Sequence, residues 1–123
     1  MTRNDARAAF AKAGLSTAAL KVDDIAALWR SIDAELRASG LENATLRLDP
    51  DPRILADETG RVISADLQCC SERFRNSQAV TFAKNGFIGF AGWADDTFLT
   101  PILNGFTSWM ATMSRHHTPP TVL

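Results

Sequence analysis

The sequence predicts a single α+β domain with two N-terminal helices, an antiparallel sheet of four to five strands, and a long C-terminal helix packed on the sheet. Apolar residues recur at helical spacing in residues 24–39 and again after residue 100, and the residues between these segments alternate as they do in strands. The chain has 123 residues, 46% of them hydrophobic and 22% charged, which suits one domain with its own core.

Two helices are expected before residue 40. Thr2 is a suitable N-cap for the first helix, with Asp5 favouring its positive end, and Gly14 can end it. Asp23 is the predicted N-cap of a second helix over residues 24–39. The apolar side chains of that helix share one face: Ile25, Leu28, Trp29, Ile32 and Leu36.

The pattern changes from helix to strand after Gly40. "NATLRLD" alternates apolar and polar residues, and "RILADETGRVIS" predicts a hairpin around residues 58–60. The next strand, from residue 61 to about residue 73, is expected to have two different faces. One face would carry Ile63, Ala65, Leu67 and Cys69, and the other Ser64, Asp66, Gln68 and Cys70.

A second hairpin is predicted at Asn85-Gly86 in "TFAKNGFIGF". This dipeptide favours a two-residue type I′ turn, which would place Phe82 opposite Gly89. Both faces of the hairpin would then be fairly apolar. We therefore expect either an inner strand covered on both sides or a face used for association.

The last predicted element is a helix that starts near Thr100, with Pro101 at its first position. Its apolar stripe consists of Ile102, Leu103, Phe106, Trp109, Met110 and Met113. Residues 1–115 are therefore expected to form the single domain, and residues 116–123 a flexible C-terminal tail.

The charge and hydropathy of the chain argue against several classes of protein. A formal net charge of −1 does not provide the strong basic field that most nucleic-acid binders use. No apolar run is long enough for a transmembrane helix, and the N-terminus does not resemble a secretory signal. We expect a cytoplasmic protein that does not associate with membranes.

The cysteines and histidines do not predict a metal site. Cys69 and Cys70 are adjacent, as are His116 and His117, and adjacent residues on a strand point to opposite faces. Zinc ligands usually come in pairs with two to four residues between them, so that both can reach one ion. We expect no bound metal or cofactor, with Cys69 buried and Cys70 at the surface.

Paired carboxylates occur once beside an apolar strand, at Asp95 and Asp96. Two acids there could bind a divalent cation or act as an acid–base pair. Capping of the following helix is the interpretation we favour, because carboxylate oxygens accept hydrogen bonds from the first helical N–H groups.

The loop "SERFRNSQ" is the most suggestive polar stretch, because Arg73 and Arg75 flank Phe74. Arginine and aromatic side chains are enriched at the energetic centres of protein interfaces. An ordinary solvated hairpin loop would explain the same composition. The run "GFAGW", followed by Pro101, Phe106 and Trp109, resembles short phage or prophage reading frames, which implies an accessory role such as blocking a host system.

The sequence therefore predicts a non-enzymatic protein-binding module, such as a small adaptor or inhibitor, with a homodimer among the expected states. The candidate partner-binding residues are Arg73, Phe74, Arg75, Phe87, Trp93, Asp95 and Asp96. One alternative is a single-stranded nucleic-acid-binding protein that uses Arg73 and Arg75 with Phe87 or Trp93. The other is a small metal-assisted enzyme that uses Asp95 and Asp96.

Overall fold

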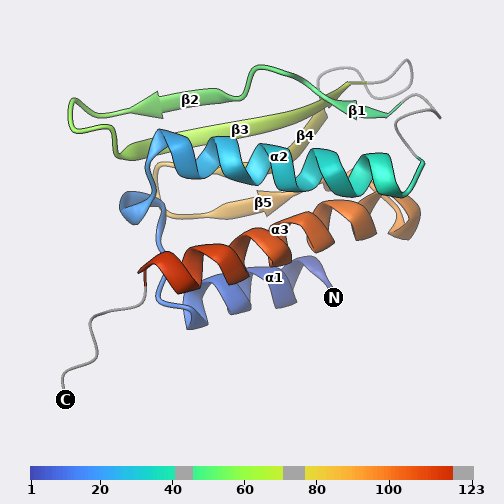
Figure 1. Cartoon of the computed structure of the whole chain (residues 1–123), viewed down its shortest axis with the longest axis horizontal. Helices are drawn as coiled ribbons and strands as arrows, with labels where there is room; N and C mark the ends of the chain where they lie inside the picture. The colour runs from blue at the N-terminus through green and yellow to red at the C-terminus, as the bar shows by residue number, and fades with distance from the viewer. Residues whose placement is uncertain (41–45, 71–76, 118–123) are drawn as a thin grey trace.

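The computed structural model describes residues 1–40, 46–70 and 77–117, the last four (114–117) by their backbone alone. In this part of the chain, three α-helices lie on one face of an antiparallel sheet of five strands, which confirms the predicted α+β fold (Figure 1). The elements in chain order are α1 (Arg3–Lys12), a short 3₁₀ helix η1 (Thr17–Ala19), α2 (Val22–Ala38), β1 (Arg47–Leu48), β2 (Arg53–Ala56), β3 (Val62–Cys70), β4 (Ser77–Phe82), β5 (Ile88–Phe90) and α3 (Asp96–His117).

Helix α1 begins where the sequence predicts. The Thr2 hydroxyl accepts a hydrogen bond from the Asp5 N–H at 3.1 Å, and the Asp5 carboxylate accepts one from the Thr2 N–H at 2.9 Å. These two bonds satisfy backbone donors that the first helical turn leaves without partners. They also lower the pKa of the Asp5 carboxyl group.

Helix α2 begins two residues earlier than predicted, so Asp23 is not its N-cap. The N-cap is Lys21, whose N–H donates to the Asp24 carboxylate at 2.8 Å. Both aspartates therefore lie in the first turn, where negative charge is favourable. The predicted apolar stripe is confirmed, because Ile25, Leu28, Ile32 and Leu36 are buried.

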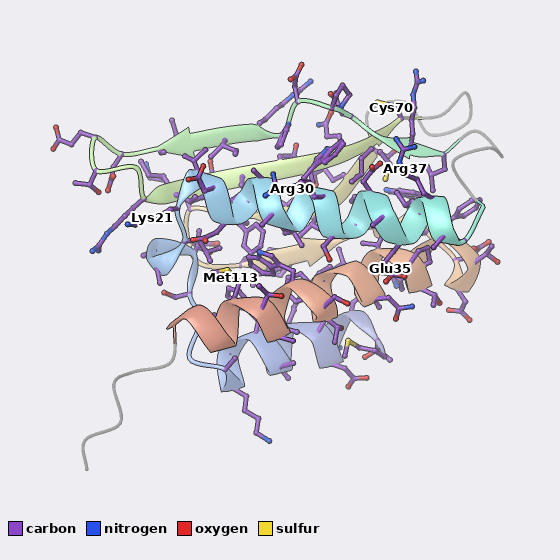
Figure 2. All side chains as sticks on the ribbon, viewed as in Figure 1. Lys21, Arg30, Glu35, Arg37, Cys70 and Met113 are labelled. Atoms are coloured by element: carbon purple, nitrogen blue, oxygen red, sulfur yellow. The ribbon has the colours of Figure 1, made fainter. Side chains whose placement is uncertain are left out.

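Trp29 lies at the border of that stripe and is half-buried. Its indole N–H donates to the carbonyl oxygen of Asp49, so it ties α2 to the segment between β1 and β2. The opposite face of α2 carries charged side chains, including Arg30 and Arg37, which point away from the sheet (Figure 2). None of the helices in the described residues is long and apolar enough to cross a membrane.

Strand β3 is the centre of the sheet. It pairs with β1 and β2 along one side and with β4 along the other, and β5 pairs with β4. The register between β2 and β3 shifts by one residue, since Leu55 is opposite Ser64 but Ala56 is opposite Val62. This bulge turns Val62 into the core and leaves Ile63 half-exposed, so the prediction that Ile63 shares the buried face was wrong.

The other buried positions of β3 are as predicted, with Ala65, Leu67 and Cys69 all inside.

The hairpin between β4 and β5 differs from its prediction. Ala83 N–H donates to the Phe87 carbonyl oxygen at 2.7 Å, and Gly86 N–H donates to the Ala83 carbonyl oxygen at 2.9 Å. The loop is therefore three residues long, with a type I turn and a positive φ of 87° at Gly86 alone.

The longer loop moves the register of this hairpin by one residue. Phe82 lies opposite Ile88, and Thr81 lies opposite Gly89. A shift of one residue reverses the direction of every side chain in the strand. Ile88 and Phe90 consequently point into the core, and Gly89 points to the other face.

Helix α3 begins one turn earlier than predicted. Asp95, not Thr100, caps it, because an Asp95 carboxylate oxygen accepts from the Thr97 N–H at 3.0 Å. Pro101 lies inside the helix, where its missing N–H interrupts one hydrogen bond of the ladder. The helix reaches His117, so it extends into the expected 116–123 tail, and residues 118–123 lie outside the described part.

The core lies between the sheet and the three helices. A cluster of aromatic rings fills its centre, and it includes Phe106 of α3. Its ring centroid is 4.8 Å from that of Phe90, 5.5 Å from that of Trp109 and 6.0 Å from that of Phe10. Phe82 of β4 packs at 6.0 Å from both Phe10 and Trp109, so the cluster joins two helices to the sheet.

Candidate functional site

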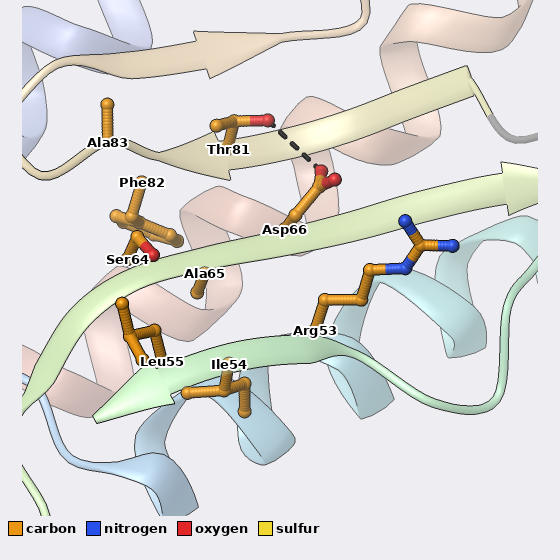
Figure 3. Close-up of a pocket in the computed structure, with 9 residues that line it drawn as sticks. All are labelled: Arg53, Ile54, Leu55, Ser64, Ala65, Asp66, Thr81, Phe82 and Ala83. Carbon is orange, nitrogen blue, oxygen red and sulfur yellow. Dashed lines mark hydrogen bonds between the residues drawn. The ribbon is translucent and has the colours of Figure 1, made fainter.

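The three helices cover one face of the sheet, and no described element packs on the other (Figure 3). We call this second surface the open face. Its side chains alternate with the buried ones along each strand, as the period of two requires. It is formed by Arg53, Leu55, Ser64, Asp66, Thr81 and Gly89, with Phe87 and Trp93 at its border. Gln68 follows Asp66 on the same side of β3, but its side chain is buried.

Asp66 is the centre of the open face. One of its carboxylate oxygens accepts a hydrogen bond from the Thr81 hydroxyl at 3.2 Å (Figure 3), and the other accepts from the Gln68 amide at 2.9 Å. Each carboxylate oxygen has two lone pairs, so each can accept a further donor from outside. Three neighbouring side chains on two strands therefore hold a negative charge in one orientation.

Two shallow hollows flank this centre, and Thr81 lines both. The first, of about 370 Å³, lies across β2, β3 and β4 and includes Arg53, Leu55 and Asp66 (Figure 3). The second, of about 240 Å³, lies across β4 and β5 and includes Trp93. Shallow hollows of this kind suit the side chains of a flat partner better than they suit an enclosed small molecule.

Apolar side chains lie at the two ends of the open face. Leu55 is 55% exposed and Phe87 is 53% exposed, which is unusual for large apolar residues. The ring of Phe87 lies over Gly89, since a Cβ atom there would be only 3.2 Å from its ring carbon Cε1. The Arg7 guanidinium lies 5.1 Å from the centroid of the same ring, in the range of a cation–π contact.

Of the predicted partner-binding residues, the structure places Phe87 and Trp93 on or beside the open face. The Trp93 indole N–H donates to the Gln78 carbonyl oxygen at 2.9 Å, and its ring packs near Phe98 at 6.3 Å. Trp93 is thus a half-buried wall of the second hollow. Arg73, Phe74 and Arg75 lie outside the described residues.

Asp95 and Asp96 have a structural role in the helix start. The Asp95 carboxylate accepts from the N–H groups of Thr97 and Phe98, and the Asp96 carbonyl oxygen accepts from the Thr100 hydroxyl at 2.7 Å. The capping interpretation is confirmed for Asp95. Within the described residues, no group of three or more histidine, cysteine or acidic side chains could hold a metal ion.

Local sequence patterns do not single out the centre of the open face. Asp66, Thr81, Arg53 and Leu55 belong to predicted strands but are not among the candidate site residues. The alternation Ser64, Asp66, Gln68 is the signal that could have found them, because three polar residues in a row on one strand face indicate an uncovered face.

Cys69 and Cys70 point to opposite faces, as predicted, and neither forms a disulfide. Cys69 is fully buried, and Cys70 is half-buried at the end of β3 (Figure 2). Burial, and to a lesser extent the neighbouring Cys70, raise the pKa of the Cys69 thiol from 9.0 to about 12. The thiol of Cys69 therefore stays protonated, and unreactive, in the native protein at neutral pH.

We expect the Cys70→Ser variant to show no reaction of its single remaining thiol with a maleimide under native conditions, and one equivalent after unfolding in guanidinium. Because an unfolded Cys69 would ionise near pH 9, stability should also fall as the pH rises from 9 towards 12. The Cys69→Ser variant is the control for the labelling, and fast native labelling of Cys70→Ser would contradict the burial of Cys69.

Another hollow, of about 540 Å³, lies outside the open face, between η1 and the two hairpin loops. Ser16 and Thr17 line one side, and Arg61 and Lys84 line the other together with Asp57. Both signs of charge are present in its lining.

The chain was also compared with known proteins. No protein-family model, no curated protein and no solved structure matches it. What can be inferred about its activity therefore depends on the geometry described above.

Proposed function

We propose that the protein is a non-enzymatic binding module whose open face binds a partner protein. The observation that supports this is a sheet face on which none of the described elements packs, with exposed Leu55 and Phe87 at its ends and an oriented Asp66 at its centre. Exposed large apolar side chains mark protein interaction sites, and here they lie at the rim of the face instead of at the usual apolar centre.

The size of the open face suits a small interface. Strand β3 has nine residues and is therefore about 30 Å long, but the strands beside it have only two to six residues. At the usual rise and strand spacing, the five strands together cover roughly 400 Å², about half of what each partner contributes to a standard interface.

The side chains of the open face also indicate the chemistry of the partner. Asp66 can accept further hydrogen bonds, and its neighbours on the adjacent strands are Arg53 and Thr81, which matches a lysine or arginine set among polar residues. Arg53, exposed at the same hollow, matches an acidic residue. The partner surface is expected to be mixed in charge, not a uniformly charged polymer.

The test is affinity capture from the native host's lysate by the wild-type chain and by two variants, each with and without nuclease. Thr81→Arg places a long cation in the middle of the open face, and Arg30→Glu changes an exposed charge on the helix side. We expect a stoichiometric, nuclease-resistant partner that the wild type and Arg30→Glu retain and that Thr81→Arg loses, with all three chains folded by circular dichroism.

If Thr81→Arg still captured the partner, or if Arg30→Glu no longer captured it, the partner would bind a surface other than the open face. Recovery of nucleic acid alone would support the single-stranded nucleic-acid alternative instead, and salt-sensitive oligonucleotide binding would then be the next measurement.

A further inference from the structure

The two edges of the sheet differ in how their backbone groups are used. On β5, the Arg7 guanidinium donates to the Ile88 carbonyl oxygen, and in the segment that follows the strand, Arg3 donates to the carbonyl oxygens of Ala91 and Ala94. Helix α1 therefore covers that edge with two arginines. The opposite edge is β2, which pairs with β3 alone among the described strands (Figure 1).

The backbone groups that β2 leaves unpaired can be identified from its hairpin. Asp57 N–H donates to the Arg61 carbonyl oxygen at 2.9 Å, so the amide of Asp57 faces β3. Backbone direction alternates along a strand, so Leu55 also faces β3, and Ile54 and Ala56 direct their N–H and C=O groups outward. An edge with unpaired N–H and C=O groups is a template for another strand.

A second copy of the chain can pair with this edge in one best register. Placing Ile54 opposite Ala56 of the second copy uses both outward residues of both chains, and forms four backbone hydrogen bonds. Moving the register so that Ile54 faces its own equivalent brings Pro52 into the ladder, and proline has no N–H to donate. Moving it the other way brings the hairpin loop at Glu58 into the ladder.

The side chains are complementary in the same register. Leu55, 55% exposed, would lie opposite Leu55 of the second copy, and Arg53 would lie opposite Asp57 of the second copy. All three bonds that the Asp57 carboxylate accepts, from Thr59 and Arg61, go to Oδ1, which leaves Oδ2 to meet a guanidinium. Twofold symmetry makes this ion pair twice.

We propose that two copies of this chain associate through antiparallel pairing of their β2 edges, with Leu55 on the twofold axis and Arg53 of each copy paired with Asp57 of the other. The favoured occupant of this edge is a second copy because the backbone register and the charges are self-complementary. Residues opposite each other in an antiparallel pair lie on the same face of a sheet. Both open faces therefore look in one direction, side by side.

The pairing is expected to depend on concentration. Five residues from each chain, 53–57, bury much less than the roughly 1,200 Å² found at the lower end of stable interfaces. The dimer should therefore be a reversible one, visible by sedimentation equilibrium as the protein concentration approaches about 1 mM.

Arg53→Glu should weaken the dimer about tenfold or more, because it places two acidic side chains opposite each other twice. Arg53→Lys keeps the charge and should stay within about threefold of the wild type. Ala56→Pro should weaken the dimer at least tenfold, since it removes an outward N–H from each copy while leaving the β2–β3 ladder intact. Circular dichroism checks that each variant folds.

Hydrogen exchange read by NMR provides a measurement that needs no variant. Raising the concentration of the wild-type chain should slow exchange of the Ile54 and Ala56 amides and leave Leu55, already bonded to β3, unchanged. A wild-type chain that stays monomeric at about 1 mM would overturn the proposal. A dimer whose dissociation constant is unchanged in Arg53→Glu and Ala56→Pro would also overturn it. The same holds if the Ile54 and Ala56 amides are protected from exchange only when a different protein is added, and not when the concentration of this chain is raised.

Discussion

Replacing Phe106 with alanine should lower the free energy of unfolding by about 4 kcal/mol. Its ring is fully buried and contacts Phe10, Phe90 and Trp109 at centroid distances from 4.8 to 6.0 Å. Truncation to alanine therefore loses both the transfer free energy of the ring and the contacts around the cavity that remains. Urea denaturation followed by tryptophan fluorescence measures the loss.

Phe87→Ala is the matched control for this prediction, because the same atoms are removed from a ring that is 53% exposed. It should cost less than about 1 kcal/mol, since most of that ring is already in water. If both substitutions had similar costs, the aromatic cluster around Phe106 would not be the centre of the core. A folded Phe87→Ala protein is also suited to binding assays on the open face.

Gly105→Ala is expected to destabilise the protein by about 3 kcal/mol, although alanine is the better helix former by about 1 kcal/mol. The reason is the close approach of α3 to α2 at this residue. A Cβ atom at Gly105 would lie 2.6 Å from the Cα atom of Ile32 and 2.9 Å from its backbone nitrogen. Since these are backbone atoms, whole helices must move apart to make room.

The same crossing is held by a hydrogen bond, because the Ser31 hydroxyl donates to the Gly105 carbonyl oxygen at 2.7 Å. Gly92→Ala is the control, because a Cβ atom there would meet nothing within 4 Å. Thermal denaturation should show a large fall in Tm for Gly105→Ala and almost none for Gly92→Ala. Equal Tm values for the two variants would mean that the helices do not cross as closely as described.

The two proposals for this protein reinforce each other but can fail separately. A β2–β2 dimer would double the open face without covering it, since β2 pairs through its edge. Two binding surfaces on one assembly increase the apparent affinity for a partner with repeated sites. Ala56→Pro tests the dimer, because it changes the backbone of the sheet edge and no side chain of the open face, and Thr81→Arg tests the open face, so each of these variants addresses one proposal.

The sequence alone determined the order and the type of the elements. Local signals carry this information: the Thr2–Asp5 capping box, the apolar stripe of α2 and the glycine turns are all read from residues close together in the chain. The burial of Cys69 and its opposite orientation to Cys70 also followed from the strand period of two.

Element boundaries and registers depended on contacts that the sequence pattern does not reveal. Helix α2 starts at Val22 because the Asp24 carboxylate accepts a hydrogen bond from the Lys21 N–H. Helix α3 starts at Asp96, and not at the predicted Thr100-Pro101, because the Asp95 carboxylate accepts a hydrogen bond from the Thr97 N–H. Asn85-Gly86 predicts a two-residue turn, whereas the loop that ends at Gly86 has three residues. Asn-Gly favours both, and packing of Ile88 and Phe90 in the core selects the longer one.

The candidate site was decided by the tertiary structure. A polar alternation on β3 is visible in the sequence, but only the position of all three helices on one face shows that none of the described elements packs on the other. The hydrogen bonds that cover the β5 edge of the sheet are likewise long-range, because Arg3 and Arg7 donate to carbonyl oxygens more than 80 positions away in the sequence. Periodicity identifies which residues share a face, whereas only packing determines what covers it.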